Sequence, residues 1–162
     1  MSPSNRDPTD PYSADAPEDG PGGQTCRPHS AAQARSEVEL ALHPLLCAPD
    51  AHVRAAHRDG VENAQLVASE LITDALTRST PGVPCILTCT LGRYEVTISV
   101  TGHYGMPTRP HQPSCPPGPH PGAIHLDRLR RRIVQESTDR LQTCWRTDGE
   151  RTTTATVPLT GP

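Results

Sequence analysis

The longest unbroken apolar periodicity in the chain runs through residues 62–79 and predicts an amphipathic helix. Its apolar residues recur at steps of three and four, which places them on one side: Ala64, Val67, Ala68, Leu71, Ile72 and Ala75. A second row contains Glu70, Asp74 and Arg78, each one turn from the next. Two carboxylates at this spacing repel by roughly 0.2–0.5 kcal/mol on an exposed helix. We expect Arg78, a bound cation or solvent to offset this repulsion.

The pattern before this helix predicts one strand and one short helix. Residues 37–43 alternate between apolar and polar side chains, which is typical of a half-buried strand. Asp50 is a suitable cap for a short helix over residues 51–58. Gly60 then predicts a break between this short helix and the long one.

The pattern after the long helix predicts two β-hairpins separated by a helix. Gly92 and Arg93 form the first tight reversal, and Asp148 with Gly149 forms the second. The predicted elements are strands 85–91 and 94–100, a helix over 123–137, and strands 141–146 and 152–159. This order predicts an α/β (α+β) two-layer sandwich, with a mixed, mostly antiparallel sheet and helices on one face.

Composition divides the chain into a tail and one domain. Residues 1–35 are rich in Pro, Ser, Asp and Gly, so we expect a disordered tail there and a single domain over 36–160. The net charge of −3 gives no nucleic-acid footprint, and no stretch is long and apolar enough to span a bilayer. Because none of the six cysteines is spaced C-x-x-C, we expect reduced thiols in a cytoplasmic protein.

The run Ser-Glu-Leu-Ile-Thr-Asp-Ala-Leu over residues 69–76 resembles the asparagine-box helix of the GHKL (Bergerat-fold) ATPases. The resemblance is closest to the anti-sigma-factor serine kinases, whose pattern is S-E-L-V-T-N-A-V-x-H. It implies that Glu70 is the general base and that Asp74, at the place of the family's asparagine, is the Mg²⁺ ligand. Arg78 stands where the family usually has histidine.

The same resemblance extends over residues 37–159 and assigns further nucleotide contacts. Gly102 falls at the position of the aspartate that accepts from adenine, and residues 103–122 correspond to the mobile lid over the phosphates. In the last box Arg151 falls on the family's threonine, so Thr152 next to it is the candidate for the hydrogen-bonding role. The implied nucleotide-binding residues are Asp74, Arg78, Gly102, Gly105, Met106, Gly122 and Thr152.

Other candidate chemistry lies in the lid and in the helix after it. His111, Cys115, His120 and His125 are potential metal ligands, but their spacing matches no closed site, so solvated side chains are the favoured interpretation. The arginine run over 128–132 is either a solvated face or a contact for phosphate or an acidic partner.

Two functions follow from these features. The first is an ATP- and Mg²⁺-binding regulator that phosphorylates a serine of an antagonist protein. The second is a pseudoenzyme without nucleotide, suggested by Gly102 and the proline-rich lid, that binds a sigma factor or an anti-anti-sigma protein. Proteins of this family often form homodimers, and the sequence leaves open whether this chain does.

Overall fold

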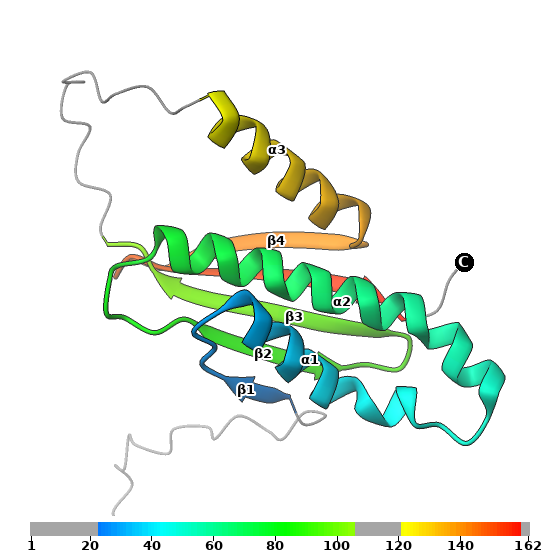
Figure 1. The fold of residues 1–162 in the computed structure, drawn as a ribbon. Helices are drawn as coiled ribbons and strands as arrows, with labels where there is room; N and C mark the ends of the chain where they lie inside the picture. Colours follow the sequence, from blue (N-terminus) through cyan, green and yellow to red (C-terminus); the bar gives the residue numbers. More distant parts are fainter. Residues whose placement is uncertain (1–22, 106–120, 160–162) are drawn as a thin grey trace, which may run out of the picture.

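A five-stranded sheet and three helices make up the computed structural model, which describes residues 23–105 and 121–159 (Figure 1). The strands are β1 (Gln24–Cys26), β2 (Ile86–Leu91), β3 (Glu95–His103), β4 (Arg140–Trp145) and β5 (Glu150–Pro158). The helices are α1 (Ala31–Leu46), α2 (Ala51–Arg78) and α3 (Pro121–Glu136). The sheet order is β1-β2-β3-β5-β4, and every pairing between these strands is antiparallel.

Both layers of the predicted sandwich are present. Helices α1 and α2 lie side by side across one face of the sheet, and α3 lies next to α2 on the β4 side (Figure 1). The prediction of an α+β two-layer sandwich is therefore confirmed, and the sheet among the described strands is antiparallel rather than mixed. In the described part of the chain, no helix has both the length and the apolar character needed to cross a membrane.

The strand predicted over residues 37–43 is wrong, because this segment belongs to α1. Its buried residues Ala34, Val38 and Leu42 are spaced by four, so they form one helical stripe against the core. Leu40, which completed the alternating pattern, is 63% exposed. Ser30 caps the helix, since its side chain accepts a hydrogen bond from the backbone N–H of Gln33 at 3.2 Å.

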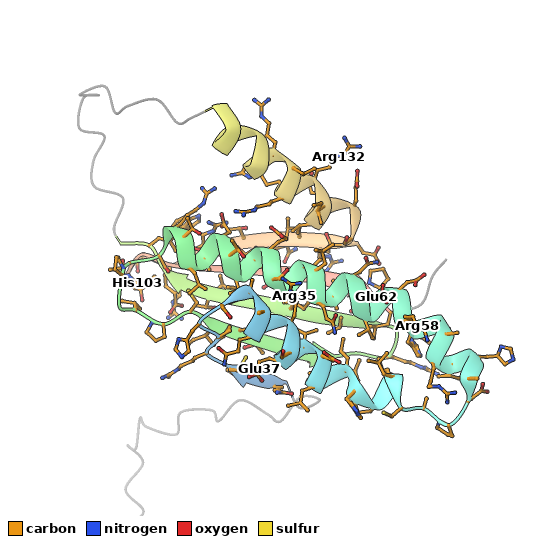
Figure 2. The ribbon with its side chains drawn as sticks, in the orientation of Figure 1. Arg35, Glu37, Arg58, Glu62, His103 and Arg132 are labelled. Atoms are coloured by element: carbon orange, nitrogen blue, oxygen red, sulfur yellow. The ribbon has the colours of Figure 1, made fainter. Side chains whose placement is uncertain are left out.

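The predicted tail boundary at residue 35 is also too late. Strand β1 and the first turn of α1 both precede residue 36 and belong to the fold. Gln24 of β1 donates to Glu37 of α1 through their side chains at 3.2 Å, which links the first strand to the helix layer (Figure 2). The remainder of the predicted tail, residues 1–22, lies outside the described residues.

Gly60 does not separate two helices as predicted, because α2 continues through it. Asp50 caps this helix, with its carboxylate accepting from the backbone N–H of His52 at 2.7 Å. A Cβ added at Gly60 would lie 2.6 Å from the Cα of Leu159 and 2.8 Å from the Pro158 carbonyl oxygen. Glycine is therefore needed here because the helix and the end of the sheet approach closely.

The core between the layers is aliphatic, as the absence of Phe requires. Leu87, Ile98 and Val157, which project from neighbouring strands, are almost fully buried against α1 and α2. Two free thiols belong to this core, since Cys85 and Cys89 are 1% and 5% exposed. Burial raises the pKa of the Cys89 thiol to about 11, so this side chain is a neutral core residue. The two hairpins and the helix before β4 agree with the sequence prediction.

Candidate functional site

Two carboxylates of α2, those of Glu70 and Asp74, lie beside a cleft of about 270 Å³ between α2, α3 and the last two strands. Glu70 and Asp74 are partly buried, with side chains 21% and 32% exposed. The residues that line the cleft are Glu70, Leu71, Asp74, Arg130, Arg131, Val134, Gln135, Leu141, Thr143, Arg151 and Thr153. The structure therefore brings together two of the predicted site residues, Glu70 and Asp74.

Each carboxylate oxygen of Asp74 contacts a different arginine. Its Oδ1 lies 2.6 Å from Nε of Arg78, one turn further along α2. Its Oδ2 accepts a hydrogen bond from an Nη atom of Arg151 on β5 at 3.3 Å. Asp74 thus links α2 to the sheet. The two guanidinium groups also offset the repulsion between the carboxylates of Asp74 and Glu70, which lie one helical turn apart.

Glu70 is less exposed than Asp74 and has fewer charged partners among the described residues. Its Oε2 lies 3.4 Å from Nε of Arg130 on α3, which is within ion-pair distance. The same oxygen is buried and accepts no hydrogen bond, so the contact with Arg130 is electrostatic rather than a directed bond. Glu70 therefore contributes to the cleft wall a carboxylate with one acceptor atom that has no hydrogen bond in the described structure.

Arg151 is held by aromatic rings as well as by Asp74. The centre of its guanidinium lies 5.1 Å from the ring centroid of Tyr104 and 5.7 Å from that of Trp145. The two rings contact each other edge to face at a centroid distance of 5.6 Å. These cation–π contacts orient the guanidinium, and its buried Nε has no acceptor among the described residues. Burial raises the pKa of Tyr104, so its hydroxyl is neutral at physiological pH.

Gly102 is the direct cross-strand partner of Arg151 in the β3–β5 pairing. It is buried, and a Cβ there would lie 3.1 Å from Cε2 of Tyr104 and 3.5 Å from Sγ of Cys85. The position assigned to the adenine-reading aspartate therefore has no acceptor and little room for one. Instead, the side chain next to it is an arginine, which can only donate.

The remaining predicted contacts lie away from the cleft or outside the described residues. Thr152 shares a hydroxyl–hydroxyl bond of 2.9 Å with Thr101, whereas its neighbour Thr153 lines the cleft. Gly105 has a positive φ of 70° and lies two residues after His103, the last residue of β3 (Figure 2). Gly122 lies in the first turn of α3. Met106, the rest of the lid to residue 120, and with it His111, Cys115 and His120, lie outside the described residues.

Sequence reasoning did not place Arg151 in the site and left the role of Arg130 and Arg131 open between a solvated face and a phosphate contact. Arg151 was placed only as a mismatch in the last box, and Arg130 only as part of a basic run. Among the described residues that line the cleft, there are three arginines and two carboxylates, which leaves one excess positive charge. A cleft with this balance favours an anionic ligand.

The residues present do not fit the magnesium ion that the family resemblance implies. Mg²⁺ requires oxygen ligands at about 2.0–2.1 Å in near-octahedral geometry. Both oxygens of Asp74 are engaged by guanidinium groups, so a cation there would have to displace two ion pairs. Within residues 23–105 and the described part of 121–159, no group of three His, Cys, Asp or Glu side chains could hold a metal ion.

Comparison with known proteins adds no assignment to this geometry. No model of a known protein family matches the chain, and no curated protein matches it. Function therefore has to be inferred from the cleft and its residues.

Proposed function

We propose that this chain is an ATP-binding regulatory protein similar to the anti-sigma-factor serine/threonine kinases. The observation that carries the proposal is that Glu70 and Asp74 lie along one wall of a 270 Å³ cleft whose other walls supply arginine. Leu71, Val134 and Leu141 add apolar surface to the same cleft. Apolar walls with a few convergent polar groups are typical of sites that bind small organic ligands.

The polar groups of the cleft suit the phosphates of such a ligand. Arg130 and Arg131 come from α3, and Arg151 comes from β5, so guanidinium groups approach from two elements. Arginine binds phosphate through paired N–H donors. Transfer of a phosphoryl group to a serine of an antagonist protein needs a base for the serine hydroxyl, and Glu70, with its unsatisfied oxygen, is the residue suited to that role. The protein partner under this proposal is a sigma factor or an anti-anti-sigma protein.

The test is a thermal-shift series on the full chain with ATP, ADP and GTP. Binding at 100 times the dissociation constant adds about 2.7 kcal/mol to stability, so Tm rises measurably. Glu70→Ala should keep the ATP-induced shift but abolish phosphorylation of a serine substrate. Glu62→Ala is the matched control, because Glu62 is an exposed residue of the same helix outside the cleft (Figure 2). Absence of any shift at millimolar nucleotide would contradict the proposal.

A second candidate is a nucleotide-free pseudoenzyme that binds a sigma factor or an anti-anti-sigma protein. Its specific support is Gly102, which offers no side-chain acceptor for adenine. The discriminating variant combines Gly102→Asp with Asp74→Asn, and Gly102→Ala controls for crowding against Tyr104. Gain of ATP binding in the double variant, with none in the parent, would support the pseudoenzyme. ATP binding by the parent would eliminate it.

A further inference from the structure

We propose that the cleft binds its polyphosphate ligand without a divalent cation, and that Arg151, held by Asp74, takes the place of Mg²⁺. This inference rests on the proposed nucleotide-binding function and concerns how the same site neutralises phosphate. It assigns Asp74 a different role from the one that the family resemblance implies. Asp74 positions two guanidinium groups and is not a metal ligand.

The contacts of Asp74 carry this assignment. Its two oxygens are used by two separate arginines, at 2.6 Å for Arg78 and 3.3 Å for Arg151. The carboxylate is only 32% exposed, so little of its surface remains for a hydrated ion. A magnesium ion keeps several waters of its own and would need space for them. Binding it at Asp74 would also place a divalent charge directly beside the two guanidinium groups.

Arg151 has the geometry of a preorganised phosphate donor. Its guanidinium contacts two aromatic rings and one carboxylate, which fixes its plane before any ligand arrives. Arg151 lies on the cleft wall with its side chain 20% exposed, so part of the side chain remains open to a ligand in the cleft. Because the side chain is already ordered, binding costs little further conformational entropy.

The charge balance of the cleft also favours a phosphate ligand without a bound divalent cation. Among the described residues that line the cleft, arginines exceed carboxylates by one. A free triphosphate carries two more negative charges than its magnesium complex, so it gains more from a positively charged cleft.

The experiment is isothermal titration of the full chain with ATP and, separately, with inorganic tripolyphosphate at constant ionic strength. Each titration is run in EDTA and again with excess MgCl₂. We expect both ligands to bind in EDTA, with affinity about tenfold weaker when Mg²⁺ is added, since the complex carries less charge. MgCl₂ alone should give no binding heat.

Two arginine variants make the test specific. Arg151→Gln should weaken binding of both ligands in EDTA by at least about tenfold, because a charge-assisted donor is lost. Arg132→Gln is the control, since Arg132 lies on α3 outside the cleft, pairs with Glu136 at 2.7 Å and is 75% exposed (Figure 2). Near-ultraviolet and far-ultraviolet circular dichroism establish that each variant is folded.

The outcomes separate this inference from the proposed function. ATP binding that requires Mg²⁺ would overturn the inference and leave the proposed function standing. Binding of tripolyphosphate without ATP would support a cation-free anion site and contradict nucleotide binding. Binding of neither ligand would overturn both. Equal affinity of Arg151→Gln and the parent would overturn the assignment of Arg151.

Discussion

Gly60→Ala is the substitution that tests most directly how α2 sits on the sheet. Alanine in the interior of a helix is normally better than glycine by about 0.5–1 kcal/mol, so the local expectation is stabilisation. The surroundings of Gly60 predict the opposite. A Cβ would lie 2.6 Å from the Cα of Leu159 and 2.8 Å from two carbonyl oxygens, those of Pro158 and Leu159.

The expected magnitude follows from the atoms that the methyl group would meet. All three are backbone atoms, so the clash cannot be relieved by a rotamer change, and the helix or the end of β5 has to move. Such overpacking costs about 1–3 kcal/mol, and the gain in helix propensity offsets only part of it. Movement would also strain the contact of 3.1 Å between Nδ1 of His57 and the Leu159 carbonyl oxygen. We expect net destabilisation of about 1–2 kcal/mol, or a fall in Tm of about 2–8 °C.

The assay is urea and thermal unfolding of the full chain, followed by far-ultraviolet circular dichroism. Asp59→Ala is the matched control, because Asp59 is an exposed neighbour in the same helix and its replacement gains propensity without a clash. We expect this control to be as stable as the parent or slightly more stable. A Gly60→Ala variant that is more stable than the parent would refute the close approach of α2 and Leu159.

Two further predictions concern the α1 cap and a core thiol. Ser30→Ala removes the acceptor for the N–H of Gln33 and should lower the free energy of unfolding by about 1 kcal/mol in urea melts; an unchanged midpoint would contradict the cap. Burial raises the pKa of Cys89 from its ordinary value of 9.0 to about 11. The unfolded chain therefore loses this proton first, so the contribution of Cys89 to stability is complete below about pH 9 and declines towards pH 11. A Cys89→Val variant should lack this part of the alkaline decline in urea midpoints, and an identical decline in the two proteins would contradict the shift.

The elements that the sequence predicted correctly are those whose signals are local. The β2–β3 and β4–β5 hairpins combine alternating residues with short turn sequences, and Gly149 has the positive φ of 85° that its turn favours. The prediction for the first helix was wrong because Val38 and Leu42 fit both the two-residue period of a strand and the four-residue step of a helix. Ala34 extends only the helical pattern, and it lies in the segment that was predicted to be a tail. Packing against α2, a tertiary contact, selects the helix.

The candidate site was predictable only where its residues share one helix. Glu70 and Asp74 are adjacent because of helical spacing alone, and the sequence places them together correctly. Arg151 is 77 residues from Asp74, and their contact depends on the register between β3 and β5. A shift of one residue would turn Thr152 towards the cleft and Arg151 away from it. The sequence carries the residue types but not that register.

The register also connects the four positions at which this chain departs from the family pattern it resembles: Asp74, Arg78, Gly102 and Arg151. Asp74 contacts both Arg78 and Arg151, and Arg151 is the cross-strand partner of Gly102. An acid at position 102 would lie beside Arg151 and compete with Asp74 for it, so glycine there leaves the guanidinium to the helix carboxylate. The departures are therefore physically connected. Where the family has an acidic acceptor at position 102, this chain has a glycine beside Arg151, a donor that Asp74 holds in place. This linkage is the physical reason to expect a cleft that recognises its ligand by donating hydrogen bonds.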